Sequence, residues 1–166
     1  EVQVSEAIKV EKLFLARNKI KSLKGVEHFC MLNYLDFNEN EVDSLELTGL
    51  GMLTLLQCHS NKIKSIDLNG SPLLEKLTVF NNSLTSLDLK YSAKLKYLYC
   101  YNNNIDSLDL RFLPDLLILD CSHNQLIKID LGKLNKITTL KVQNNKLENI
   151  ELQELNQLDT LNVGTN

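Results

Sequence analysis

The chain of 166 residues has no tryptophan, only two prolines and only 6% aromatic residues. It also lacks any apolar run close to the roughly 20 residues of a membrane-spanning helix, so we expect no membrane insertion. Its lysines and arginines are scattered, and its formal net charge is −3. Because nucleic acids and anionic membranes select basic patches, neither is an expected partner.

What the chain does have is leucine at fixed intervals. The stretch from Leu95 to Ile105 carries leucine at its first and fourth positions, Cys100 at its sixth, Asn103 at its ninth and isoleucine at its eleventh. This frame recurs after 22 residues once and after 21 residues thereafter. Its ninth positions are Asn18, Asn40, Asn61, Asn82, Asn103, Asn124, Asn145 and Asn166. A fixed period of this size is the signature of leucine-rich repeats.

The repeat predicts an α/β-type solenoid that is mostly β, namely a right-handed leucine-rich repeat solenoid with a parallel concave sheet. The first, fourth, sixth and eleventh positions are expected to face the core, and the third, fifth and seventh to face outward on the sheet. A 21-residue unit leaves too few residues for an α-helix, so short strands or 3₁₀ turns are expected on the convex side. The less regular first unit is expected to hold a helical turn after Gly25.

The ninth-position asparagines are expected to be structural. A side-chain amide both donates and accepts hydrogen bonds, so stacked copies can satisfy backbone groups that a tight turn leaves unpaired. The expected asparagine ladder consists of Asn18, Asn40, Asn61, Asn82, Asn103, Asn124 and Asn145.

Two regions divide the chain. Residues 1–9 are expected to be an N-terminal capping segment, with the end of a calcium-loop-like unit closed by Glu6 as the alternative. Residues 10–166 form the leucine-rich repeat domain, with seven full repeats and a truncated eighth. Because that unit stops at Asn166 without a polar cap, we expect the natural chain to continue and an apolar end to be exposed.

Three cysteines share the sixth position of their units, where other units carry aliphatic residues or Phe37. A cysteine at such a place behaves as a small hydrophobe, so Cys58, Cys100 and Cys121 are expected to be buried and reduced. Cys100 and Cys121 fall on adjacent strands about 4.8 Å apart. Parallel inward side chains nevertheless rarely reach the dihedral angle of a disulfide.

The pattern LxxLxCxxNxL, followed by LDL within 21 residues, resembles bacterial cell-surface leucine-rich repeat proteins of the internalin-J-like class. The resemblance covers residues 10–166, although Phe37 and several valines leave the cysteine column incomplete. It implies a secreted or wall-attached extracellular protein. It also implies that the concave surface holds another macromolecule, often in adhesion.

No catalytic or metal centre is expected. Cys58 and His59 are neighbours on a strand and point to opposite faces, so they cannot form a nucleophile–base pair. Asp120, Ser122 and His123 lack an evident oxyanion hole and shielded pocket. No CxxC pair suggests zinc, and His59 and His123 lie on strands about 14 Å apart. We therefore expect no enzyme, no metal and no cofactor.

An acidic position recurs in the second half of the units. It is occupied by Glu46, Asp67, Asp88, Asp109, Asp130 and Glu151. We expect these carboxylates to be solvated and to accept hydrogen bonds from nearby turn amides or serines. A cation bound between neighbouring carboxylates is the alternative.

The concave face is expected to carry most of the aromatic residues, including Tyr97, Tyr99 and Tyr101 from a single strand. Exposed tyrosine with a polar rim is typical of recognition surfaces, whereas rings that only pack on one another are the alternative. The candidate ligand-binding patch consists of Tyr34, His59, Phe80, Tyr97, Tyr99, Tyr101, Asp120 and His123. We expect a monomeric binding module whose partner is a protein, with a glycan-binding surface or a structural stalk as alternatives.

Overall fold

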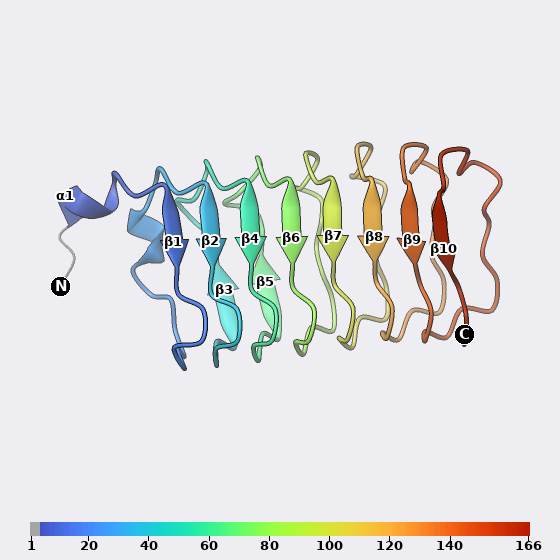
Figure 1. The fold of residues 1–166 in the computed structure, drawn as a ribbon, viewed down its shortest axis with the longest axis horizontal. Helices are drawn as coiled ribbons and strands as arrows, with labels where there is room; N and C mark the ends of the chain where they lie inside the picture. Colours follow the sequence, from blue (N-terminus) through green and yellow to red (C-terminus); the bar gives the residue numbers. More distant parts are fainter. Residues whose placement is uncertain (1–3) are drawn as a thin grey trace.

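The computed structural model describes residues 4–166, so the first three residues of the expected capping segment lie outside the described part. The chain winds into a curved solenoid in which each coil adds one strand to a parallel sheet (Figure 1). The order of this eight-stranded sheet is β1-β2-β4-β6-β7-β8-β9-β10. Its strands are β1 (Lys12–Phe14), β2 (Tyr34–Asp36), β4 (Leu55–Gln57), β6 (Lys76–Thr78), β7 (Tyr97–Tyr99), β8 (Ile118–Asp120), β9 (Thr139–Lys141) and β10 (Thr160–Asn162). The expected mostly β, parallel solenoid is confirmed.

The convex side carries only short elements, as the length of the repeat predicts. Strands β3 (Ser44–Glu46) and β5 (Ser65–Asp67) form a two-stranded parallel sheet. The 3₁₀ helix η1 (Val26–His28) begins after Gly25, whose φ of 100° is readily adopted only without a Cβ. The single α-helix of the described residues, α1 (Val4–Ala7), precedes the first strand.

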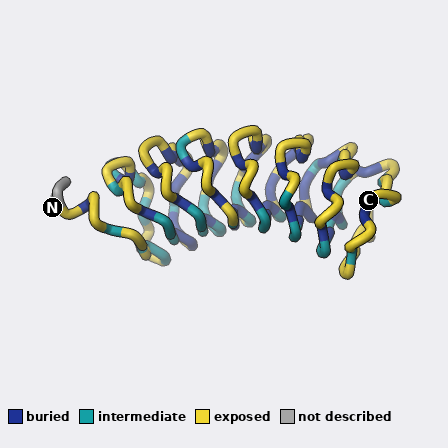
Figure 2. The backbone as a smooth tube through the Cα atoms, turned by 90° about the horizontal axis from the view of Figure 1, so that it is seen from above, coloured by how far each residue is buried: buried dark blue, intermediate teal, exposed yellow. Residues whose placement is uncertain are grey.

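The core is a column of leucines stacked from coil to coil, and Figure 2 shows buried segments recurring along the whole solenoid. Leu74 and Leu77 of one unit, and Leu95 and Leu98 of the next, are completely buried. Fully burying such a side chain contributes about 1.5–3 kcal/mol. Since every coil repeats this burial, the coils stabilise one another through contacts between neighbours.

The sixth position faces the same core. Cys58, Cys100 and Cys121 are buried, which confirms their inward placement, whereas Cys30 is exposed. Burial raises the pKa of the Cys58 thiol above its ordinary value. Burial, reinforced by the negative charge of Asp120, raises the pKa of the Cys100 thiol to about 12. These thiols therefore behave as small apolar side chains.

The ninth-position asparagines connect neighbouring coils. The Nδ2 of Asn124 donates to the carbonyl oxygen of Cys100 at 3.0 Å and to that of Cys121 at 3.1 Å. Its Oδ1 accepts a hydrogen bond of 3.0 Å from the backbone N–H of Ile105. Asn124 is 4% exposed, so the buried amide satisfies backbone groups that water cannot reach.

The convex carboxylates fold back onto their own turns. Asp67 Oδ1 accepts from the N–H of Asn69 at 2.9 Å, and Asp88 Oδ1 accepts from the N–H of Lys90 at 3.1 Å. The same bond, from the amide two residues later, is made by Asp109 and Asp130. The expected exposed carboxylates that accept turn amides are therefore confirmed for these four aspartates.

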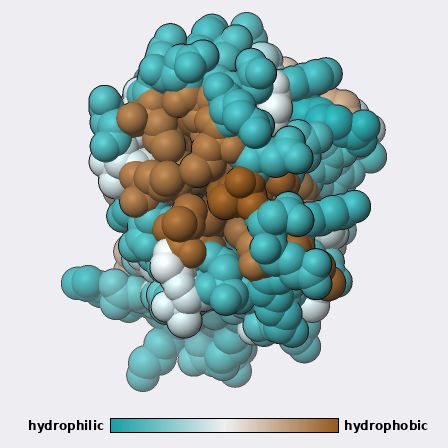
Figure 3. Space-filling model, turned by 90° about the vertical axis from the view of Figure 1, so that its right-hand side faces the viewer, coloured by the Kyte–Doolittle hydropathy of each residue, from teal (hydrophilic) through white to brown (hydrophobic). Residues whose placement is uncertain are grey.

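The C-terminal end of the solenoid exposes apolar side chains, which gather in one patch in Figure 3. Leu161 of β10 is 42% exposed, although Leu140, its partner in register on β9, is completely buried. Val163 is 37% exposed, whereas Val142 one unit earlier is completely buried. These side chains have core neighbours on one side only.

Candidate functional site

The concave face is built by strand alternation. In each three-residue strand the middle residue points into the core, and the two flanking residues point away from it. Parallel pairing in exact register then places Tyr99 between Thr78 and Asp120. It places Tyr97 between Lys76 and Ile118, as the repeat predicts.

Three rings at the seventh position form a stack. The His59 and Phe80 rings lie 4.2 Å apart between centroids, and the Phe80 and Tyr101 rings lie 4.3 Å apart. Both pairs are within 8° of parallel. In-register coils place these side chains about 4.8 Å apart, close to the separation at which rings stack. Burial lowers the pKa of His59, although Asp36 and Glu39 oppose this shift.

A concave hollow of about 570 Å³ lies beside this stack. It is lined by Lys76, Thr78, Phe80, Tyr99, Tyr101, Asn102, Asp120, Ser122, His123, Lys141 and Gln143. Of the sequence-predicted patch, it brings together Phe80, Tyr99, Tyr101, Asp120 and His123. We call this hollow, with all of the residues that line it, the concave hollow.

Three residues of the sequence-predicted patch lie outside the hollow. His59 is separated from it by the ring of Phe80. Tyr97 lies on β7 beside Lys76, which does line the hollow. Tyr34 lies on β2 against Phe14 at the N-terminal end of the sheet, with ring centroids 5.1 Å apart.

Asp120 is the most buried charged group of the hollow, with 8% of its surface exposed. Its Oδ1 accepts a hydrogen bond of 2.6 Å from Ser122 Oγ and another from the Ser122 N–H at 3.3 Å. Its Oδ2 lies 3.7 Å from Lys141 Nζ, which is an ion pair too long for a hydrogen bond. Burial, together with the charge of Asp120, raises the pKa of Tyr101.

Sequence reasoning did not assign the lysines and Gln143 to the site. Lys76 Nζ lies 5.7 Å from the centroid of the Tyr99 ring, a distance at which an ammonium is attracted to the ring. Gln143 Oε1 is buried without a hydrogen-bond partner. These residues occupy the same outward positions of the repeat as the tyrosines, and this was the signal that could have identified them.

His123 reaches the hollow from its rim. It lies at the corner after β8, with a φ of 53°, and it is exposed. Its Nε2 contacts Asn144 Nδ2 at 3.1 Å, while the Ser122 hydroxyl donates to Asp120. The three side chains are thus not linked as a nucleophile, a base and an orienting acid.

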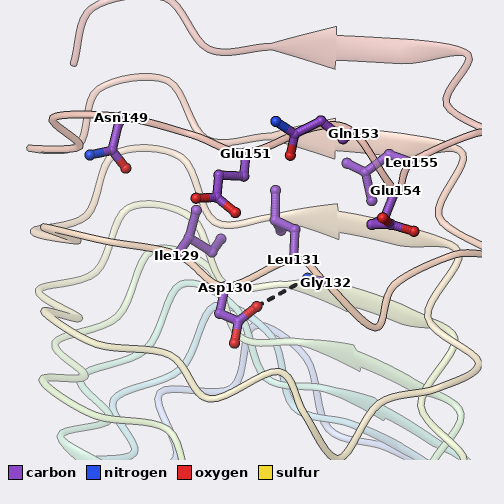
Figure 4. Close-up of a pocket in the computed structure, with 9 residues that line it drawn as sticks. All are labelled: Ile129, Asp130, Leu131, Gly132, Asn149, Glu151, Gln153, Glu154 and Leu155. Carbon is purple, nitrogen blue, oxygen red and sulfur yellow. Dashed lines mark hydrogen bonds between the residues drawn. The ribbon is translucent and has the colours of Figure 1, made fainter.

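Metal ligands do not converge anywhere in residues 4–166, where no group of three or more histidines, cysteines and carboxylates could hold an ion. A hollow of about 330 Å³ on the convex side is lined by Asp130, Glu151 and Glu154 (Figure 4). One of these carboxylates, Asp130, accepts from the Gly132 N–H at 3.0 Å. Within the described residues, no helix is long and apolar enough to cross a membrane.

Comparison with known proteins yields structural relatives only. No protein-family model and no curated protein matches the chain. The functional domain of InlJ from Listeria monocytogenes, which includes a cysteine ladder, matches with 27% identity and a TM-score of 0.74. The match covers 95% of this chain and 40% of that one.

Two further solved structures share the fold. A leucine-rich repeat protein of Leptospira interrogans matches with 23% identity and a TM-score of 0.75, over 97% of this chain and 50% of that one. Internalin C2 of Listeria monocytogenes matches with 21% identity and a TM-score of 0.69, over 96% of this chain and 84% of that one. The chain thus spans half or less of the first two relatives. Its 21-residue repeat and the solenoid that it shares with these proteins make it a leucine-rich repeat protein that is similar in fold to the internalins.

Proposed function

We propose that this chain is a non-enzymatic binding module of a secreted or cell-surface bacterial protein, and that it recognises a protein partner through the concave hollow in adhesion or host contact. The observation that carries the proposal is the hollow itself, where Tyr99 and Tyr101 are half-buried beside polar and charged side chains. Tyrosine offers a large contact area at a low cost in conformational entropy, and recognition surfaces are enriched in it.

The ring stack supports a protein rather than a glycan as the partner. A sugar stacks on an open ring face, and the stack offers few of these, because both faces of Phe80 and one face of Tyr101 are covered by neighbouring rings. The edges and hydroxyl groups of the rings remain available, and these suit the mixed apolar and polar contacts of a protein interface.

The test compares the wild type with two variants. One is the Tyr99→Ala/Tyr101→Ala double variant, which removes the rings of the hollow. The other is Asp88→Asn, which changes an exposed convex carboxylate and serves as the control. Each protein is immobilised, and proteins retained from host-cell extracts are quantified by mass spectrometry. A glycan array is probed in parallel, and circular dichroism verifies folding.

We expect specific proteins to be retained by the wild type and the control and lost from the double variant. Truncating a central ring of an interface costs about 2 kcal/mol or more of binding free energy. Equal retention by all three proteins would place recognition elsewhere or favour a structural stalk. Binding to the array that depends on the same rings would instead favour the glycan.

A further inference from the structure

Lys76 is a basic residue held in the concave hollow without a counter-charge. Among the residues that the structure describes it makes no ion pair, and its ammonium group lies beside the Tyr99 ring. Two lysines elsewhere on the surface are neutralised by a nearby carboxylate, Lys62 by Glu41 at 3.0 Å and Lys96 by Glu75 at 3.0 Å. Lys76 differs from them in lining the concave hollow with no such partner among the described residues. The unpaired cation is therefore free to meet an anion of a ligand.

Lys141, on the opposite side of the hollow, is only weakly paired. Its Nζ lies 3.7 Å from Asp120 Oδ2, beyond hydrogen-bond distance. Asp120 directs its other oxygen to Ser122. All three donors of the Lys141 ammonium thus remain available to a ligand.

The charge of this hollow is opposite to that of the molecule. Its lining holds Lys76 and Lys141 against the single carboxylate of Asp120, while the whole chain carries a formal charge of −3. The convex hollow contains carboxylates and no basic residue (Figure 4). An acidic ligand is therefore attracted to the concave hollow and repelled from the convex one.

We propose that the concave hollow binds an acidic segment of the partner protein, with one carboxylate at Lys76 and a second at Lys141. This inference rests on the proposed function and specifies the chemistry of the partner. The lysines lie on β6 and β9, which are three strand spacings of about 4.8 Å apart, or about 14 Å. Lys141 is two residues further along its strand, but the Lys76 ammonium lies near the Tyr99 ring, which is in register with Lys141. An extended peptide rises about 3.4 Å per residue, so acidic residues four positions apart span the two lysines and cross the Tyr99 ring.

The probe is a synthetic peptide, acetyl-Ser-Glu-Ser-Ala-Ser-Glu-Ser-amide, in which the glutamates are four positions apart. A second peptide has glutamine in place of both glutamates, and a third has the two glutamates adjacent. Each is titrated into the ¹⁵N-labelled chain, and affinity is read from chemical-shift changes at low and high salt.

We expect the spaced-glutamate peptide to bind most tightly, with shifts centred on β6 to β9 that weaken as salt rises. Lys76→Gln and Lys141→Gln should each lower its affinity by up to about fivefold, the range of an exposed ion pair. Lys62→Gln removes the same charge away from the hollow and should leave the affinity unchanged.

Asp120→Asn tests whether the charge of Asp120 opposes an acidic ligand. Asparagine can still accept a hydrogen bond from Ser122, but it removes the negative charge that repels the peptide. Affinity for the acidic peptide should rise. A lower affinity of the Asp120→Asn variant for the acidic peptide would overturn the proposal. Equal binding of the glutamate and glutamine peptides would also overturn it. So would lysine-dependent binding of a uronic-acid oligosaccharide in place of the peptide. If the acidic peptides fail while the tyrosine double variant still loses its partner, the concave site stands and the acidic chemistry is wrong.

Discussion

The backbone N–H of Leu84 donates a 3.0 Å hydrogen bond to the side-chain oxygen of Asn103, which lies one coil further along the solenoid. The Nδ2 of Asn103 donates in turn to the carbonyl oxygens of Val79 and Cys100, both at 3.1 Å. A single buried side chain therefore satisfies backbone groups of two coils. The stacking of the coils depends on such bonds as well as on apolar contact.

Replacing Asn103 by alanine should therefore be costly. Each buried backbone group left unpaired costs about 1–3 kcal/mol, so Asn103→Ala should lower the free energy of unfolding by about 3 kcal/mol or more. Asn18 is exposed, and its Nδ2 donates to the Ala16 carbonyl at 2.7 Å, so Asn18→Ala should cost much less. Urea denaturation followed by circular dichroism measures both. Equal losses would contradict the argument that burial makes the hydrogen bonds of Asn103 the more costly ones to lose.

The ring stack predicts unequal effects of two alanine substitutions. Phe80 is stacked on both faces, by His59 and by Tyr101, whereas among the described residues Tyr101 is stacked only on Phe80. Each aromatic pair contributes about 0.5–1.5 kcal/mol beyond its buried area. Phe80→Ala should thus destabilise the chain by about 1 kcal/mol more than Tyr101→Ala, as measured by chemical denaturation. A larger loss from Tyr101→Ala would contradict this order.

The cysteines should differ sharply in reactivity. Thiolate is the reactive species, and burial raises the pKa of Cys58, Cys100 and Cys121. In the native protein an aromatic disulfide reagent should label Cys30 rapidly and the other three only at the rate of unfolding. Cys30→Ser should abolish the rapid phase. Fast labelling of more than one thiol in the native state would refute the buried column.

Position along the solenoid should control the cost of losing a leucine. Leu140 and Leu161 are partners in register, but the first is completely buried and the second is 42% exposed. Leu140→Ala should cost about 2–5 kcal/mol because it leaves a cavity. Leu161→Ala should cost about 1 kcal/mol or less, because its surroundings are open on one side. Thermal and urea denaturation of the two variants provide the comparison.

The exposed pair of Asp109 and Arg111 predicts a small acid dependence. Hydrogen bonds from the Arg111 side chain and backbone lower the pKa of Asp109 to about 2. Because this pKa is depressed on folding, the stabilisation is present above about pH 4 and is lost as the pH falls toward 2. Arg111→Gln should raise the pKa of Asp109 while the backbone bond keeps it below its ordinary value. Carbon-detected NMR titration of the carboxyl group is the measurement, and an unchanged pKa would argue against the side-chain bond.

The repeat in the sequence was sufficient to predict the solenoid, because a unit of 21 residues allows one short inner strand, one turn and little else. Strand alternation then assigned each position to the core or to the concave face. For this reason the neighbours of Tyr99, namely Thr78 and Asp120, followed from counting alone. So did the inward direction of Cys58, Cys100 and Cys121.

Which side chains meet within the concave face was decided only by the tertiary structure. Register places Lys76 beside Tyr97, yet its ammonium lies near the ring of Tyr99, diagonally across the sheet. A lysine has four flexible carbons, so contacts from neighbouring coils select its direction. For the same reason the sequence alone did not reveal that Lys76 lacks a counter-charge or that Lys141 lies near Asp120. The period determines the backbone and the direction of each Cβ atom, whereas packing between coils determines where the long side chains end.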